Sequence, residues 1–219
     1  MNHRHVILEG KPTTGKTEVS NLFKIYLPEQ IHILPELSTV VVRENGLNIL
    51  RDRQRLTDLL RDAVPRRSEE VQRLLQTSDK LIFEESHMGV HWAYCKQLDD
   101  RTFLDIYESD IEPHVLTPDI FMRLDIPVAL SVRRQIARAT ADVAVSGDLV
   151  TNTFAHLDAW HDARGDENLV VVNTNRFHNR LVGFIFKLKL HPSGFSLAKK
   201  IKQVVSVKTH LYCVARVVN

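Results

Sequence analysis

GKPTTGKT, residues 10–17, consists of a glycine, four further residues and then Gly-Lys-Thr. In the pattern G-x-x-x-x-G-K-[S/T], glycines let backbone N–H groups converge on phosphate oxygens, and the following helix adds its positive end. Lys16 brings a charge to the outer phosphates, and the Thr17 hydroxyl is a ligand for Mg²⁺. An apolar run at 6–8 and helical spacing over 17–27 supply the required strand and helix. The predicted phosphate site consists of Gly10, Lys11, Pro12, Thr13, Thr14, Gly15, Lys16 and Thr17.

Four more short apolar runs follow, and segments with helical spacing separate them. The runs are residues 31–34, 81–83, 120–124 and 169–172, and the helical segments are 47–61, 67–76, 91–107, 127–139 and 150–163. Short apolar runs without alternation are typical of strands in a parallel sheet that is covered on both faces. The pattern therefore predicts a three-layer α/β/α fold with a five-stranded, mostly parallel sheet.

Charge divides the chain into two blocks. All 27 acidic residues lie in residues 1–175, whereas 9 of the 29 basic residues lie in residues 176–219. The 219 residues have an ordinary globular composition, with 43% hydrophobic and 26% charged residues, and this length suits one α/β domain. We expect a domain over residues 1–175 and a basic C-terminal extension over 176–219 that packs on the same domain.

Targeting and redox signals favour a cytoplasmic protein. Cys95 and Cys213 are far apart and outside any metal-ligand spacing, and the 11 histidines form no zinc motif. The first residues lack the apolar core of a signal peptide, and the run LVGFIF at 181–186 is too short to span a bilayer. We expect a soluble protein with no membrane span and no structural zinc.

Acids and amides follow the apolar runs, where parallel sheets place their ligands. Glu36 follows the second run, and Glu84 and Glu85 follow the third. Side chains alternate along a strand, so one of this pair faces the site, where it can bind Mg²⁺ through water. Asp125 follows the fourth run and is expected to be a buried strand-end carboxylate. Solvated strand ends are the alternative for the glutamates.

Taken in order, these segments resemble the P-loop kinases of nucleosides and nucleotides, the group that contains thymidylate kinase and the deoxynucleoside kinases. The likeness covers residues 4–175 and rests on GKPTTGKT (10–17), LPELS (34–38), LIFEESHMGVHWAYC (81–95) and PDIFMRLDIPVALSVRRQIAR (118–138). It implies a P-loop NTPase fold with a short lid, ATP and Mg²⁺ as cofactors, and transfer of the γ-phosphate to a nucleoside or nucleoside monophosphate.

The resemblance also implies roles for strand-end residues. Glu36 lies where deoxynucleoside kinases keep an acid near the sugar and the attacking oxygen. Glu85 keeps the spacing to Tyr94 that the acid of the family's third-strand motif keeps from its Ala-Tyr pair. Asn173 and Asn175 end the fifth run, where the family surrounds adenine. Which of the two glutamates orients the acceptor hydroxyl stays open.

Arginines precede the expected lid, residues 139–148. Arg134 and Arg138 are four residues apart and share a helix face, whereas Arg133 points elsewhere. The resemblance implies that such arginines close over the phosphates and stabilise the transferring group. A solvated basic face is the alternative.

Two departures from the family leave the acceptor open. Ser86 stands where an arginine normally follows the third-strand acid, and the basic tail matches nothing in the family. Aromatic and imidazole side chains after the third run are candidates for the acceptor pocket or for the core; they are His87, His91, Trp92 and Tyr94.

Other functions are compatible with the same loop. One is a P-loop ATPase or NTP-dependent switch that reaches a macromolecular partner through the basic tail, and another is a kinase of a different small molecule. The tail segment LAKKIKQVV, residues 197–205, allows nucleic-acid binding, although a solvated helix face is favoured. A homodimer is also compatible with the sequence.

Overall fold

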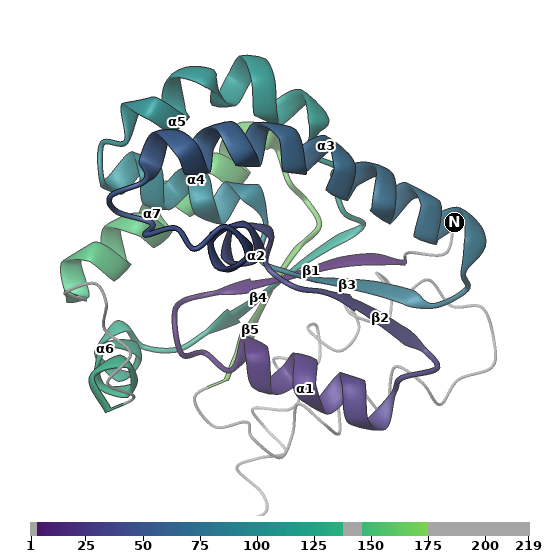
Figure 1. Ribbon diagram of the computed structural model, residues 1–219. Helices are drawn as coiled ribbons and strands as arrows, with labels where there is room; N and C mark the ends of the chain where they lie inside the picture. Colours follow the sequence, from purple (N-terminus) through teal and green to yellow (C-terminus); the bar gives the residue numbers. More distant parts are fainter. Residues whose placement is uncertain (1–3, 138–145, 175–219) are drawn as a thin grey trace, which may run out of the picture.

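Five parallel strands form the centre of the molecule, in the order β2-β3-β1-β4-β5 (Figure 1). The computed structural model describes residues 4–137 and 146–174, and all strand pairs within this part are parallel. The strands are β1 His5–Gly10, β2 Ile31–Leu34, β3 Leu81–Glu85, β4 Ile120–Asp125 and β5 Leu169–Asn173. Each contains one of the five apolar runs, so the predicted sheet is confirmed.

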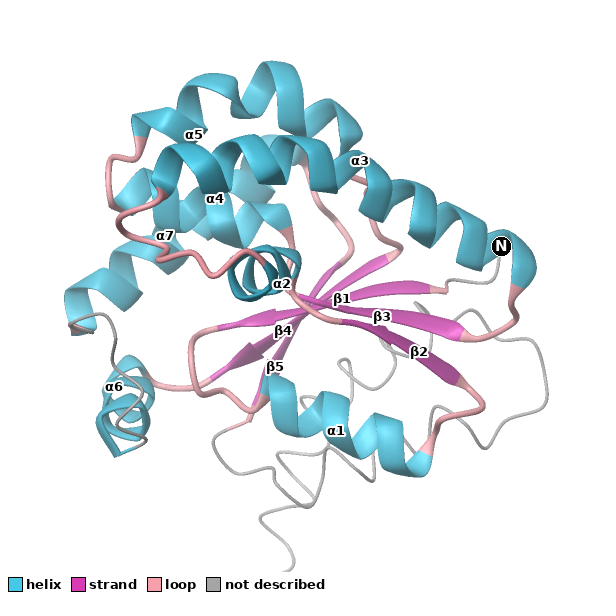
Figure 2. Cartoon of the chain, in the orientation of Figure 1, coloured by secondary structure: helices cyan, strands magenta, loops and turns pink. Residues whose placement is uncertain are grey.

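Helices cover both faces of this sheet. They are α1 Lys16–Tyr26, α2 Leu37–Glu44, α3 Arg53–Thr77, α4 Met88–Gln97, α5 Arg101–Ile106, α6 Val128–Ala137 and α7 Gly147–Arg164, with short helical turns at Tyr107–Ile111 and Glu112–His114. Figure 2 shows α1 on one face and α3, α4, α5 and α7 on the other. The three-layer α/β/α fold is therefore confirmed.

Alternation along β1 directs neighbouring side chains to opposite layers. Leu8 is fully buried against Val19 and Phe23 of α1. Ile7, also fully buried, packs with residues of α4 and α7 such as Val90 and Phe154. Because both faces are apolar, β1 shows no alternation in sequence, which is the signature of a central parallel strand.

The helices predicted at 47–61 and 67–76 belong to one continuous helix, α3, which begins only at Arg53 and passes through Pro65. Residues 47–52 are not helical, contrary to the prediction. Proline inside a helix costs about 3 kcal/mol because its ring displaces a backbone hydrogen bond. The buried side chains of Leu60, Val64 and Val71 continue along one face across this position. Tertiary packing therefore outweighs the local penalty, and the predicted break is wrong.

Three other helical features also differ from the prediction. The segment 91–107 is divided into α4 and α5, and Asp99 between them has a φ of 48°, which a continuing helix does not allow. The short helix α2 was not predicted. Gly147 and Asp148, expected in the lid loop, instead begin α7 behind the N-cap Ser146.

Close packing of α4 against α7 places the end of β3. A Cβ added at Gly89 would lie 2.9 Å from the Trp160 ring, so glycine allows this approach. His87 is the N-cap of α4, and its Nδ1 accepts a hydrogen bond from the Gly89 N–H at 3.2 Å. Burial lowers the pKa of His87 to about 4, so the ring is a neutral cap at pH 7.

Several predicted features lie outside the described residues. They are the segment 138–145 of the expected lid, Arg138, Asn175 and the basic extension 176–219. None of the helices in the described ranges has both the length and the apolar character that a membrane span requires.

Candidate active site

Left-handed backbone shapes the loop between β1 and α1. Gly10, Thr13 and Gly15 have φ values of 148°, 61° and 101°, and Gly15 is the N-cap of α1. Such alternations turn successive backbone N–H groups toward one concavity, which attracts anions next to a helix N-terminus. The loop therefore has the backbone form of an anion-binding turn, and its role with nucleotide phosphates stays a prediction.

Helix α6 is docked on this loop by three hydrogen bonds. Ser131 Oγ donates to the Pro12 carbonyl at 2.7 Å, and Thr13 Oγ1 donates to the Ser131 carbonyl at 3.1 Å. Arg134 Nη1 donates to the Thr13 carbonyl at 3.1 Å, whereas Arg133 is exposed. The structure thus places Arg134 beside the predicted phosphate loop, and its role at the phosphates stays a prediction.

Lys16 lies among acidic side chains that come from several elements. Its Nζ donates to the Gly10 carbonyl at 2.7 Å, across the mouth of the loop. Burial lowers the pKa of Lys16, and the charges of Glu36, Glu85 and Glu9 oppose that shift. Glu36 and Glu85 are therefore close enough to the P-loop lysine to act electrostatically on it.

The two glutamates of β3 face opposite layers. Glu85 is paired with Leu8 of β1, whose side chain packs under α1, so Glu85 faces the α1 side with Lys16. Glu84 is paired with Ile7 and faces the other layer. The predicted alternation is found, and Glu85 is the member of the pair on the side of the P-loop lysine.

Glu84 belongs to a buried ionic cluster that the sequence did not suggest. Its Oε1 accepts a hydrogen bond from Arg67 Nη1 at 3.0 Å, and its Oε2 lies 3.2 Å from Nε2 of His5. Burial opposes ionisation of Glu84, but the His5 hydrogen bond and the Arg67 charge outweigh it and lower the pKa of this carboxyl. Glu84 is therefore an ionised structural partner of α3.

A cavity of about 350 Å³ opens beside the phosphate loop. Pro12 of the loop, Glu36 and Gln135 of α6 contribute to its wall, together with Arg53 and Asp100. Its remaining lining residues are Ser38, Thr39, Ile49, Leu50, Leu56, Thr57, Val90, His91, Tyr94, Cys95, Leu98, Leu149 and Val150. The volume is at the small end of the range of about 300–1,000 Å³ for ligand pockets.

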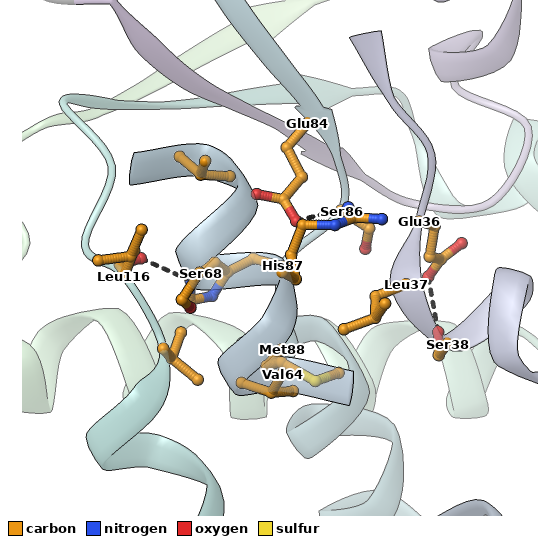
Figure 3. A pocket seen from close by; sticks show the side chains of 13 residues that line it. Glu36, Leu37, Ser38, Val64, Ser68, Glu84, Ser86, His87, Met88 and Leu116 are labelled. Carbon is orange, nitrogen blue, oxygen red and sulfur yellow. Dashed lines mark hydrogen bonds and ion pairs between the residues drawn. The ribbon is translucent and has the colours of Figure 1, made fainter. Parts of the chain in front are cut away.

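Of the four predicted pocket side chains, His91 and Tyr94 line this cavity. Burial lowers the pKa of His91 to about 4 and raises that of Tyr94 to about 12, so both rings are neutral at pH 7. His87 lines a second, smaller cavity of about 30 Å³, which also contacts Glu36 (Figure 3). Trp92 is half-buried and packs against the core instead, with its ring centroid 6.4 Å from that of Tyr107.

The ends of β4 and β5 complete the surroundings of the loop. Asp125 forms an ion pair with Lys11, and its side chain is 35% exposed, so the expectation of a buried carboxylate is wrong. Thr174 Oγ1 donates to the Thr14 carbonyl at 3.2 Å. Asn173, predicted near adenine, is the last residue of β5 and lies next to this contact; its nucleotide role stays a prediction.

Solved structures share the fold of this chain. Three structures of deoxyadenosine kinase from M. mycoides, one with dCMP and dCDP, one with dATP and one with dCTP, align over 83%, 84% and 83% of this chain and over 96%, 97% and 96% of theirs. Their TM-scores are 0.58, 0.58 and 0.57 at 12%, 13% and 12% identity. The chain has the deoxyadenosine kinase fold. No protein family model matches it, and no curated protein sequence does.

Within this deoxyadenosine kinase fold, the sequence motifs located the loop and the strand ends, but they missed Arg67. Its contacts with Pro35 and Glu84 span 32 and 17 residues. No spacing rule marks one arginine among the many of α3, because helical periodicity shows which face is buried and not which partner is met there.

Proposed function

We propose that this protein is an ATP-dependent kinase that transfers the γ-phosphate to a small acceptor, a nucleoside. The observation that carries the proposal is the cavity of about 350 Å³, whose wall includes both Pro12 of the phosphate loop and the carboxylate-bearing Glu36. A small-molecule acceptor in this cavity lies beside the outer phosphates. The nucleotide-bound deoxyadenosine kinases with the same fold support this choice over a switch that acts on a macromolecule.

Residues of the loop supply the donor site. Backbone N–H groups of residues 10–17 and the Lys16 ammonium hold the phosphates of ATP, and Arg134 is placed to neutralise charge on the transferring group. Thr17, exposed in the first turn of α1, and Glu85 would hold Mg²⁺. When bound, the metal neutralises charge on the β- and γ-phosphate oxygens.

Glu36 is the acid that orients the acceptor. It lines the cavity, and its carboxylate oxygens accept hydrogen bonds from Ser38 Oγ at 3.4 Å and Thr39 Oγ1 at 3.0 Å. In the transfer, the acceptor hydroxyl oxygen bonds to the γ-phosphorus, the bond to the bridging oxygen of ADP breaks, and Glu36 takes the hydroxyl proton. Glu85 faces Lys16 on the side of α1, which suits a metal-side role.

Separate substitutions distinguish these two roles. We expect Glu36→Gln to lower kcat about a hundredfold, because a carboxamide does not take the proton, with the Mg²⁺ requirement unchanged. We expect Glu85→Gln to raise the Mg²⁺ concentration for half-maximal rate about tenfold. Initial rates across a Mg²⁺ titration measure both, with the exposed Glu69→Gln as control. If instead Glu85→Gln lowered kcat and Glu36→Gln changed the Mg²⁺ requirement, the roles of the two glutamates would be exchanged.

Charge in the cavity favours a nucleoside over a nucleoside monophosphate. Among the described lining residues, Arg53 is the one formal cation, and its Nε lies 3.7 Å from Oδ2 of Asp100. Glu36 adds a second acid, and Ser86 stands where the family has an arginine. A dianionic phosphate in this cavity meets more negative than positive charge, and this repulsion weakens its binding.

A panel assay tests the proposal. Purified full-length protein, radiolabelled ATP and Mg²⁺ are incubated with ribonucleosides, deoxynucleosides and their 5′-monophosphates. We expect label on at least one nucleoside, with kcat/KM at least about tenfold above that of its monophosphate, which corresponds to about 1.4 kcal/mol of charge repulsion.

The Lys16→Ala protein, purified in the same way, measures contaminating kinases. Hydrolysis of ATP with no labelled acceptor would overturn the kinase proposal in favour of an ATPase. Faster labelling of monophosphates would overturn the charge argument and leave the kinase activity in place.

A further inference from the structure

Arg67 joins two strand ends from the buried side of α3. Its Nη1 donates to the Pro35 carbonyl and to Oε1 of Glu84, each at 3.0 Å. The side chains of Arg67 and Glu84 are both 11% exposed. A charge-assisted hydrogen bond with so little solvent contact is stronger and better defined in geometry than a surface ion pair.

The two residues that Arg67 contacts directly precede the candidate acids Glu36 and Glu85 in the sequence. Pro35 precedes Glu36, and Glu84 precedes Glu85. Strands β2 and β3 are neighbours, with Leu34 opposite Glu84. One guanidinium therefore fixes how the backbone leaves β2 relative to β3, at the point where both glutamates enter the site.

Further contacts hold the guanidinium in its orientation. Arg67 Nε lies 3.3 Å from Oε2 of Glu70, one turn further along α3. On the opposite side, Glu84 is held by Nε2 of His5 at 3.2 Å. Arg67 also lines the cavity of about 30 Å³. Figure 3 shows Glu36, Glu84 and Ser86 around this cavity. The ionic cluster thus reaches from α3 to β1 and passes directly behind the site.

We propose that Arg67 is a positioning residue that sets the separation of Glu36 and Glu85 for phosphoryl transfer. The inference rests on the proposed kinase function. Transfer between a bound donor and a bound acceptor is sensitive to geometry, and a misplacement of about 1 Å can cost about a hundredfold in rate. Lysine is a poor substitute, because its single ammonium lacks the planar fork that reaches Glu84, Pro35 and Glu70 together.

The test compares full-length Arg67→Gln and Arg67→Lys with Arg66→Gln, an exposed arginine at the neighbouring position of the same helix. We expect Arg67→Gln to lower kcat about thirtyfold and Arg67→Lys about fivefold. The KM for ATP should stay within about threefold, because the phosphate loop follows β1, and Arg66→Gln should match the wild type. Displacement of Glu85 should also raise the Mg²⁺ concentration for half-maximal rate.

A double variant shows whether Arg67 acts through Glu84. If it does, the kcat of the double variant Arg67→Gln, Glu84→Gln should lie within about twofold of the kcat of the slower single variant. The effects of coupled residues do not add, so the second substitution removes little more. Arg67→Lys, which retains the charge, serves if Arg67→Gln does not fold. The inference would be overturned if the Arg67 variants had the same kcat as Arg66→Gln. It would also be overturned if the kcat losses of the two single variants multiplied in the double variant. Absence of acceptor labelling by the wild type would overturn the proposed function and this inference with it.

Discussion

Lys16→Ala is expected to lower kcat/KM for phosphoryl transfer by about a thousandfold or more. The ammonium is the charge that the loop presents to the outer phosphates, and preorganised charges of this kind are worth about 10²–10³ or more in rate. The Lys16 Nζ donates a hydrogen bond to the Gly10 carbonyl, so the ammonium is already held at the mouth of the loop. Steady-state kinetics with the acceptor found in the panel measure the loss.

Stability should change little in this variant, by about 1 kcal/mol or less. Burial already lowers the pKa of Lys16, which means that the folded protein holds this charge at a cost. Lys11→Ala is the matched control, because it removes the same charge from the same loop, but Lys11 is paired with Asp125. A Lys16→Ala enzyme within tenfold of the wild type, or equal losses in both variants, would contradict the role given to Lys16.

Local pattern was sufficient for the sheet because this sheet is buried on both faces. The run 31–34 matches β2 to the residue, and the run 120–124 falls one residue short of Asp125, the end of β4. Charged residues at the strand ends were also informative, since Glu36 and Glu85 approach Lys16 as the carboxyl ends of parallel strands must.

Long-range packing explains what local pattern did not predict. The passage of α3 through Pro65 depends on the buried face formed by Leu60, Val64 and Val71, whose partners are distant in sequence. The cavity of about 350 Å³ draws its walls from α2, α3, α4, α6 and α7, so its volume follows from how these helices are arranged in space. The motifs predicted a phosphate site, and the cavity beside Glu36 supports the proposal about the acceptor.

Gly10→Ala is expected to destabilise the protein by about 4 kcal/mol. The residue has a φ of 148°, and a Cβ there would lie 2.3 Å from the carbonyl oxygen of Leu124. Backbone strain at such a φ costs about 1–3 kcal/mol, and forcing an atom into a packed site costs about 1–3 kcal/mol more. Because the contact is with the backbone of β4, no side-chain rotation relieves it.

Gly46→Ala separates strain from close packing. Gly46 has a φ of 61°, but no atom lies within 4 Å of an added Cβ, so this variant should lose about 1 kcal/mol from strain alone. Urea unfolding of both variants gives the comparison, and ATP affinity at a temperature where both are folded gives the state of the loop. If Gly10→Ala lowered the free energy of unfolding no more than Gly46→Ala does, the close approach of β1 to β4 at Gly10 would not be needed to hold the phosphate loop. If it costs about 3 kcal/mol more and also weakens ATP binding, the glycine that begins the motif serves both the sheet and the nucleotide site.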